Sequence, residues 1–426
     1  MQNVPQKNCP QSMEQRRGTK TFPICLEGTR RAYSRMQRRV AEFFAGIGLM
    51  RMGLEKEGWM TAWANDLDEK KWEMYRANFN EGACEFIVED VHKIDGKDLP
   101  DIELATASFP CNDLSLAGSR HGLAGTQSSA FWGFVDVLKT MGHRRPSLVL
   151  LENVAGFLTS NDGNDFRDAL VALNELGYAV DAFIIDAVRF VPQSRQRLFV
   201  VATKAPAVKM QELKLLQSDS RPAPLADFIF MNPDIGWNIR KLPALPPSSM
   251  KLADIIEDVP LNSEIWWSKE RCDYLLNQMS ERHRTEAERM MADSKWSYGT
   301  VFRRVRNGRS MGELRTDGIA GCLRTPRGGS GRQILFCGGM GQFRVRLLTP
   351  RECARLMGAG TYKIKVPLNQ ALFGFGDAVC VPVVQWIARH YLNPVLAELQ
   401  QMPAALPSLR KSVVYSAPRK TRVLKK

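Results

Sequence analysis

The sequence predicts an α/β protein with a mostly parallel sheet and a second, smaller and irregular domain. The first observation is that short apolar runs alternate with longer amphipathic ones between residues 38 and 203. Strands that alternate with helices of this length form βαβ units, whose sheet is covered by helices on both faces. The second observation is a change of character after Thr203, where proline-rich and then Gly/Arg-rich stretches make regular structure hard to place.

The elements follow from this pattern in order. Strands are expected at 38–44, 61–66, 84–89, 102–109, 147–152, 179–187 and 197–203, and helices near 47–57, 68–78, 128–141 and 164–176. The last two strands are separated by about ten residues without helical periodicity, which favours an antiparallel pair at the sheet edge. Further along, a charged helix is expected over 268–293, a helix from Pro350, and a short strand and helix within 377–398.

Charge is concentrated in three places. The net charge of +14 is carried by the two ends, since residues 1–40 hold nine Lys/Arg against two acids and residues 403–426 hold seven against none. Residues 300–346 hold ten arginines against Glu313 and Asp317, a stripe suited to a localised polyanion contact. The two ends suit either non-specific attraction to phosphates or plain disorder.

The cysteines and the hydropathy exclude several classes of protein. Nine cysteines are widely scattered, without a CxxC pair or zinc-ligand spacing. Such a set is typical of free thiols in a reducing cytoplasm, so neither a disulfide framework nor a metal site is expected. The sequence has no run of about 18 apolar residues, so no membrane span is expected. It also has no apolar core near residue 1, so no secretory signal is expected.

One cysteine stands where α/β proteins bind ligands, in a loop at the carboxyl end of a predicted strand. Cys111 follows Pro110 directly, after the apolar run 102–109, so its thiol is presented on a stiff turn. Taken alone, a cysteine there is more often a small buried hydrophobe than a nucleophile.

Three other strand ends indicate a pocket for an adenosine-like ligand. Phe43-Phe44-Ala45-Gly46-Ile47-Gly48 closes the first strand, and its glycines allow the backbone to approach a ligand closely. Asp66 ends the second strand, where an acid typically accepts hydrogen bonds from ribose hydroxyls, and Asp90 ends the third strand, where it could bind the far end of the same nucleoside. Each feature taken singly is equally compatible with a tight turn or a solvated acid.

Two further motifs carry a carboxyl group and a pair of guanidinium groups. Glu152-Asn153-Val154 ends an apolar strand, which would partly desolvate the carboxyl and suit it to proton donation. Gln193, Arg195 and Arg197 alternate before the last strand and are expected to share one face, so that both guanidiniums hold an anion or a carbonyl. A surface acid and a solvated basic turn are the alternatives.

The order FAGxG, PC, ENV and QxRxR, each at a strand end, resembles the cytosine-5 DNA methyltransferase family. The resemblance continues in residues 348–358, similar to the family's ninth motif, and in residues 375–379, similar to its tenth. It covers about 38–205 and 347–395 and implies a Rossmann-like, S-adenosylmethionine-dependent methyltransferase sheet. It divides the chain into a basic, disordered tail (1–36), a catalytic and cofactor-binding domain (37–205), a target-recognition domain (206–346), a segment that returns to the catalytic domain (347–400) and a second basic tail (401–426).

The resemblance implies S-adenosyl-L-methionine as methyl donor and carbon-5 of a cytosine in double-stranded DNA as acceptor. Cys111 would attack carbon-6 of a flipped-out base, and Glu152 would protonate or hydrogen-bond ring nitrogen 3. Arg195 and Arg197 would grip the cytosine carbonyl. The residues implied to bind the cofactor are Phe44, Gly46, Ile47, Gly48, Asp66, Asp90, Val91, Pro110, Asp377 and Ala378.

The arginine stripe is expected to contact the DNA. Arginine is the usual reader of guanine in the major groove, so some of these residues would read guanines while others touch phosphates. Phosphate contact alone is the other interpretation. The residues concerned are Arg303, Arg304, Arg324, Arg327 and Arg332.

The sequence departs from the family's usual pattern at five positions. Glu42 stands where Asp is usual, Leu49 replaces a third glycine, and Asn112 follows Pro-Cys where glutamine is usual. Leu67 stands where an aromatic residue often packs on adenine, and Asp377 replaces an asparagine. These departures concern cofactor affinity, since none removes a catalytic group.

The predicted function is that of a bacterial or phage-type restriction-modification methyltransferase that acts as a cytoplasmic monomer. A cognate restriction endonuclease would be its partner in such a system. Two alternatives stay open. One is a tRNA cytosine-5 methyltransferase, because one eukaryotic branch of the family modifies tRNA, although the large, arginine-rich region 206–346 suits a DNA reader better. The other is a non-catalytic DNA-binding relative.

Overall fold

The computed structural model describes most of the chain beyond residue 37. The described residues are 38–79, 82, 84–110, 129–208, 217–306, 308–325 and 331–401. They belong to the unit that begins at Arg38, which is described here by itself. Cys111, Asn112, Arg327 and the predicted basic tails, apart from Gln401, lie outside the described residues.

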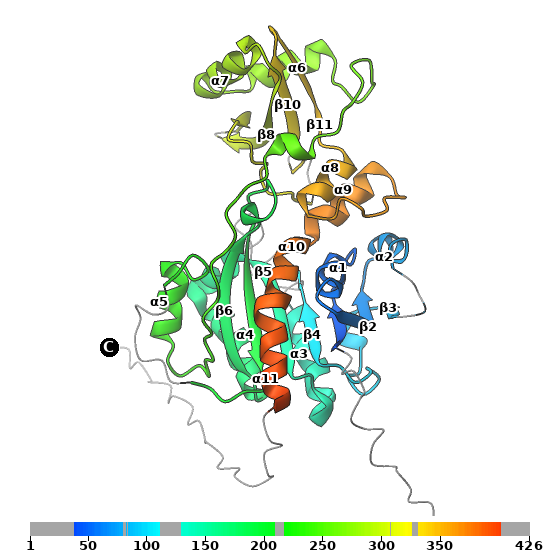
Figure 1. The fold of residues 1–426 in the computed structure, drawn as a ribbon, viewed down its shortest axis with the longest axis vertical. Helices are drawn as coiled ribbons and strands as arrows, with labels where there is room; N and C mark the ends of the chain where they lie inside the picture. The colour runs from blue at the N-terminus through cyan, green and yellow to red at the C-terminus, as the bar shows by residue number, and fades with distance from the viewer. Residues whose placement is uncertain are drawn as a thin grey trace, which may run out of the picture. The chain divides into compact units, whose positions relative to one another are not determined.

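A seven-stranded sheet of order β3-β2-β1-β4-β5-β7-β6 forms the larger part of the described chain (Figure 1). Strands β1 to β5 pair in parallel along that order, whereas β7 runs antiparallel to both of its neighbours, β5 and β6. The strands are β1 (Arg38–Phe43), β2 (Trp59–Asp66), β3 (Glu85–Val88), β4 (Leu104–Ala107), β5 (Leu148–Val154), β6 (Ala179–Asp186) and β7 (Gln196–Thr203). All seven predicted strands and the antiparallel pair at the edge are confirmed.

Helices cover both faces of this sheet because both faces of its strands are apolar. Alternate residues face opposite layers: Val40 and Leu104 join a core with α1, α8, α9, α10 and α11, while Ala41 and Ala105 join a core with α3, α4 and α5. Figure 1 shows α10 and α11 crossing one face. These helices are α1 (Leu49–Glu55), α3 (Ala130–Thr140), α4 (Asn164–Glu175), α5 (Ala223–Met231), α8 (Pro350–Leu356), α9 (Leu368–Asp377), α10 (Val381–Ile387) and α11 (Asn393–Gln401); α2 (Glu69–Arg76) flanks β2.

A second, antiparallel sheet has the order β11-β10-β8-β9. It consists of β8 (Ser297–Arg306), β9 (Arg309–Arg315), β10 (Ile334–Gly339) and β11 (Gln342–Leu347), and packs on α6 (Lys269–Asn277) and α7 (Glu281–Ala292). The predicted fold class, an α/β protein with a mostly parallel sheet and a smaller second domain, is therefore confirmed. The charged helical stretch expected over about 268–293 is present as two helices, α6 and α7, which are separated where the Gln278 carbonyl accepts a hydrogen bond from the backbone N–H of Gly312 on β9.

The strand expected near residue 377 is also wrong. Helix α9 ends at Asp377 and α10 begins at Val381, with Pro382 in its first turn. The carbonyls of Gly376 and Ala378 accept hydrogen bonds from the side chain of Arg195 instead of from a neighbouring strand. Among the described helices, the stretch Leu368–Gln401 is apolar and long enough to span a membrane by composition, but 67% of its most apolar window is buried in the fold.

Residues 221–240 lie against the larger sheet, although they belong to the stretch assigned to target recognition. Leu225 and Trp237 pack into the core beneath α3 and α4. On β6, the fully buried carboxylate of Asp181 accepts hydrogen bonds from the Arg221 guanidinium at 2.8 and 2.9 Å and from the Tyr391 hydroxyl at 3.0 Å. The Arg240 backbone N–H donates to the same carboxylate. Asp181 thereby connects the segment before α5 and the C-terminal helices to β6, the edge strand of the sheet.

We expect Asp181→Ala to lower the free energy of unfolding by about 3–5 kcal/mol, because it leaves the Arg221 guanidinium buried without its partner. Urea unfolding followed by tryptophan fluorescence measures the loss. Asp227→Ala removes an exposed carboxylate on α5 and should change stability by no more than about 0.5 kcal/mol. Equal stability of the two variants would contradict the assignment.

Candidate active site

One cavity of about 680 Å³ lies at the carboxyl ends of β1 to β5, where the order of the strands reverses between β1 and β4. Its volume is in the range of small-molecule sites. Nearly all the predicted catalytic and cofactor residues that the structure describes line it: Phe44, Gly46, Ile47, Asp66, Asp90, Val91, Pro110, Glu152, Arg195, Arg197, Asp377 and Ala378. Gly48 does not, and Cys111 lies outside the described residues.

The turn after β1 has the backbone conformation that its glycines permit. Gly46 and Gly48 have φ of +58° and +78°, and Phe44 also has a positive φ of +54°. A Cβ on Gly48 would stand 2.4 Å from the ring of Phe79 and 2.8 Å from that of Tyr75. Gly48 is therefore needed for close packing against α2 and its following turn, whereas Gly46 lines the cavity.

Asp66 holds this turn in place from the end of β2. Its carboxylate accepts hydrogen bonds from the backbone N–H of Gly46 at 2.8 Å and from that of Asp68 at 2.9 Å. Burial raises the pKa of Asp66, and the nearby charge of Lys71 opposes that shift. At the end of β3, Asp90 accepts a hydrogen bond from the His92 N–H and so caps the turn that presents Val91.

The cavity also contains polar atoms that have no partner among the described residues. The buried hydroxyls of Thr106 and Ser108, at the end of β4, are two such atoms. At the rim, Leu67 leaves 67% of its surface exposed. Unpartnered hydroxyls and an exposed apolar side chain in one cavity indicate a ligand with both polar and apolar surface.

Lys71 lines the same cavity and was missed by the sequence analysis. Its ammonium lies 3.0 Å from the carboxylate of Asp377, which belongs to α9. The charge of Asp377, and next that of Asp66, raises the pKa of Lys71 against the effect of its burial. No local sequence pattern indicates this contact, because the partner stands some 300 residues further along the chain.

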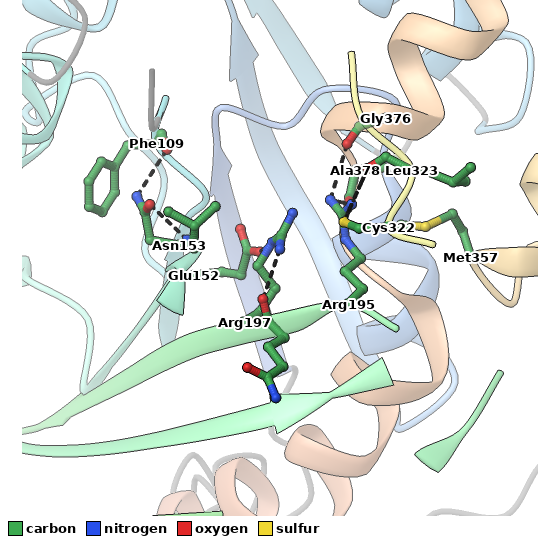
Figure 2. Close-up of polar contacts among 12 residues, drawn as sticks. Phe109, Glu152, Asn153, Arg195, Arg197, Cys322, Leu323, Met357, Gly376 and Ala378 are labelled. Atoms are coloured by element: carbon green, nitrogen blue, oxygen red, sulfur yellow. Dashed lines mark hydrogen bonds and ion pairs between the residues drawn. The ribbon is translucent and has the colours of Figure 1, made fainter. Parts of the chain in front are cut away.

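Glu152 and Arg197 form an ion pair at the other end of the cavity (Figure 2). The distance between Arg197 Nε and Glu152 Oε1 is 2.9 Å, and the Glu152 side chain is 8% exposed. Val154 is paired with Arg197 across the antiparallel β5–β7 ladder, so Glu152 and Arg197 are diagonal neighbours on one face. Next to them, the Asn153 amide donates to the carbonyl of Phe109. This hydrogen bond holds the segment that follows β4, and Phe109 stands two residues before Cys111.

The expected common face of Gln193, Arg195 and Arg197 is wrong, because β7 begins only at Gln196. The preceding residues pair with residues 320–323: Ser194 N–H donates to Ala320 O, and Gln193 accepts from the Leu323 N–H. The Gln193 side chain is fully buried and donates to Leu356 O at 2.7 Å, and Gln193 does not line the cavity.

Arg195 is 2% exposed, and its guanidinium binds protein groups (Figure 2). It donates to the carbonyl of Leu323 at 2.8 Å and to those of Gly376 and Ala378 at 3.2 and 2.6 Å. It also lies 3.3 Å from the Cys322 sulfur. Arg195 and Arg197 therefore line one cavity but point at different groups.

Cys322 has an unusual setting for a thiol outside the predicted catalytic set. Burial acts to raise its pKa, but the charges of Arg195, Arg197 and Arg324 outweigh burial and lower it. A cysteine beside three arginines is a consequence of the folded chain, and nothing in the sequence around Cys322 indicates it.

The four described arginines of the predicted DNA-binding set belong to the second sheet or to the segments that adjoin it. Arg303 lies over the ring of Trp267, with 5.6 Å between the guanidinium carbon and the ring centre, and Arg304 pairs with Glu313 at 3.1 Å. Arg324 is exposed and lies over Phe302 at 5.3 Å, and Arg332 donates to Asn369 at 2.6 Å. Arg327 lies outside the described residues.

Glu42 is buried in the cavity wall behind the glycine turn and is 1% exposed. Its carboxyl accepts long hydrogen bonds from the Arg51 N–H at 3.2 Å and the Tyr75 hydroxyl at 3.4 Å. The Arg51 guanidinium itself pairs with Glu55 at 2.6 Å. Desolvation therefore dominates and raises the pKa of Glu42 from 4.5 to about 8.

Comparison with known proteins gives a consistent match over most of the chain. The profile of the family described as C-5 cytosine-specific DNA methylase matches residues 38–393. The type II methyltransferase M.HhaI of Haemophilus parahaemolyticus is 27% identical over 356 residues, which are 82% of this chain and 93% of that protein. A DNA-cytosine methyltransferase of Escherichia coli K12 is 28% identical over 82% of this chain and 76% of its own length.

Solved structures share the fold at lower identity. The S. pombe Dnmt2 methyltransferase has a TM-score of 0.56 and 19% identity, with 85% of this chain and 99% of that chain covered. The Entamoeba histolytica methyltransferase EhMeth has a TM-score of 0.57 and 17% identity, with the same coverage. These likenesses show the arrangement of the elements.

We expect Glu42→Gln to change how stability depends on pH. The raised pKa means that folded Glu42 keeps its proton between pH 4.5 and about 8 while the unfolded carboxyl has lost it, so its stabilising contribution is complete below pH 4.5 and is lost as the pH rises. The free energy of unfolding of the wild type, relative to the variant, should fall by up to about 1.4 kcal/mol per pH unit over this window. Urea unfolding at several pH values measures it, and parallel curves would exclude the shift.

Proposed function

This chain belongs to the C-5 cytosine-specific DNA methylase family and is a DNA (cytosine-5)-methyltransferase, and we propose that it acts on a flipped-out cytosine of double-stranded DNA through Cys111, Glu152 and Arg197. The observation that carries the proposal is that one and the same cavity joins the Gly46–Asp66 end to the Glu152–Arg197 end. Pro110, the neighbour of Cys111, lines the cavity between them.

The cavity fits S-adenosyl-L-methionine, which this family generally uses. The carboxylates of Asp66 and Asp90 suit ribose hydroxyls and an exocyclic amine, and the exposed Leu67 suits the flat apolar face of adenine. The unpartnered hydroxyls of Thr106 and Ser108 would find acceptors or donors on such a ligand. When bound, the cofactor supplies an electrophilic methyl group.

The residues act on the cytosine as follows. Cys111, as thiolate, attacks carbon-6 and forms a carbon–sulfur bond, while Glu152 donates a proton or hydrogen bond to ring nitrogen 3. Carbon-5 becomes electron-rich and takes the methyl group. Loss of the carbon-5 proton and expulsion of the thiolate then restore the aromatic ring.

Arg197 has two tasks in this scheme. Its Nε holds the Glu152 carboxylate, so the acid is oriented before the base arrives. Its charge also favours the thiolate and the negative charge that develops on the cytosine carbonyl. Arg195 has a positioning role at the same site, since its guanidinium donates hydrogen bonds to the carbonyls of Leu323, Gly376 and Ala378.

The relatives support a role in restriction-modification. M.HhaI, M.Bsp6I and M.HaeII all carry the name type II methyltransferase, and we propose that this chain likewise protects one DNA sequence in a bacterial cytoplasm. A cognate endonuclease and a monomeric state stay predictions. Arg303, Arg304, Arg324, Arg327 and Arg332 are proposed to contact the DNA; of the described ones Arg304 and Arg324 are exposed, and Arg304 is paired with Glu313.

We expect Cys111→Ser to lower methyl transfer to duplex DNA by about three orders of magnitude or more while duplex binding is retained. Transfer of radiolabelled methyl groups to duplex DNA, with tRNA as a parallel substrate, measures the loss. Methylation-sensitive sequencing of host DNA then identifies the sequence modified by the wild type. Cys9→Ser is the control for the loss of a thiol. Undiminished transfer by Cys111→Ser would overturn the nucleophile, and transfer to tRNA alone would overturn the substrate.

We expect Arg324→Ala to weaken duplex binding and to reduce the slope of log K against log salt by about one, because one exposed cation is lost. Fluorescence anisotropy with a labelled duplex at several salt concentrations measures both quantities. Arg289→Ala, on the exposed face of α7 and paired with Glu286, is the matched control. An unchanged affinity and slope for Arg324→Ala would remove it from the interface.

A further inference from the structure

A short segment of the chain, residues 320–325, leads from the second sheet back to the cavity. It follows β9 and stands before the basic run that ends at Arg332. Its backbone pairs with residues 192–194 through Ala320, and the N–H of Leu323 donates to Gln193. We call it the return segment. It is the part of the recognition region that contacts Arg195 and Gly376, two residues that line the cavity.

The return segment packs directly on the end of α9. A Cβ on Gly376 would stand 2.6 Å from the carbonyl carbon of Arg324 and 2.7 Å from the nitrogen of Thr325, so only glycine permits this approach. Arg195 binds the carbonyls on both sides of the contact, Leu323 on the return segment and Gly376 on α9. The two backbones are therefore held together as one wall.

Asp377 adds a contact of a different kind, since its two carboxylate oxygens bind two different parts of the chain. Oδ1 accepts a hydrogen bond from the hydroxyl of Thr325 on the return segment. Oδ2 lies 3.0 Å from the ammonium of Lys71 on α2. The Asp377 and Lys71 side chains are 38% and 23% exposed, so the pair is partly shielded from solvent.

Lys71 connects this carboxylate to the cofactor end of the cavity. It lines the cavity together with Asp66, and the charge of Asp66 attracts its ammonium. Asp66 in turn holds the N–H of Gly46. Hydrogen bonds and an ion pair thus connect the glycine turn to Asp66 and Thr325 to Asp377 and Lys71, and the charges of Lys71 and Asp66, which line the same cavity, relate the two sets.

We infer that Asp377 is a positioning residue that couples cofactor binding to engagement of DNA by the recognition region. When DNA holds the arginines around the return segment, Thr325 fixes Asp377, and Asp377 fixes Lys71 beside Asp66. When the cofactor fills the cavity, the same contacts operate in reverse, because coupling between two sites is reciprocal. The inference rests on the proposed function, since it needs both ligands to bind this chain.

The carboxylate is what distinguishes this position from the asparagine usual in the related motif. An asparagine at 377 could still accept the hydrogen bond from Thr325, but it would carry no charge for Lys71. The Asp377→Asn variant therefore removes the ion pair with Lys71 on the cofactor side and keeps the hydrogen bond from Thr325 on the side of the recognition region. Lys71→Met removes the same ion pair from its other side.

The experiment measures the affinity for S-adenosylhomocysteine, the demethylated cofactor, by calorimetry. It is done in the absence and in the presence of a duplex that contains the sequence that the wild type methylates. For the wild type we expect the duplex to tighten binding at least about fivefold. In Asp377→Asn and in Lys71→Met the two affinities should agree within about twofold, and the double variant should add no further loss. Lys70→Met, one residue away and exposed on α2, should keep the wild-type ratio.

The ratio of the two affinities separates positioning from general damage, because a merely destabilised fold would weaken both measurements alike. A wild-type ratio near one, or a wild-type ratio kept in Asp377→Asn, would overturn the inference while the proposed function stands. If the wild type binds neither the duplex nor S-adenosylhomocysteine, the proposed function fails, and the inference fails with it.

Discussion

The buried guanidinium of Arg195 is the interaction on which the cavity depends. A charge in the interior is costly unless its donors find acceptors, and here three backbone carbonyls and one sulfur accept from the two Nη atoms of Arg195. Those acceptors come from the return segment and from the end of α9 with the residue that follows it, which are far apart in the chain. By satisfying one guanidinium, the fold brings the recognition region and the C-terminal segment to the edge of the parallel sheet.

The two ends of the cavity differ in electrostatics, and the difference follows from their place on the sheet. At the β1–β3 end, Asp66 and Asp90 present carboxylates beside backbone N–H groups and one lysine. At the β5–β7 end, Glu152 is nearly enclosed and neutralised by Arg197. The first environment suits hydroxyls and amines, whereas the second holds a carboxyl group and a guanidinium together in a desolvated space. One cavity can therefore hold a methyl donor and an acceptor with separate sets of groups.

Most of the sheet was predictable because its strands are short apolar runs that end at motifs. The strand ends at Asp66, Asp90 and Glu152 were placed from sequence, and the structure brings them to one cavity. The prediction was wrong where backbone groups found partners outside regular elements: residues 376–378 bind Arg195 rather than a strand, and Gln193 turns into the core. A period of two along QxRxR predicts a common face only if the strand extends that far, and β7 begins at Gln196.

By itself the sequence determined the class of fold, the order of the motifs and the family, because alternating apolar runs and strand-end motifs are local features of the chain. Only the tertiary structure decided which charges meet. Lys71 and Asp377, Asp181 and Arg221, and Arg195 and its carbonyls are pairs between distant segments, and no local pattern encodes them. Their partners are set by how helices and loops pack on the sheet, since a buried charge takes whichever acceptor the packing brings within reach.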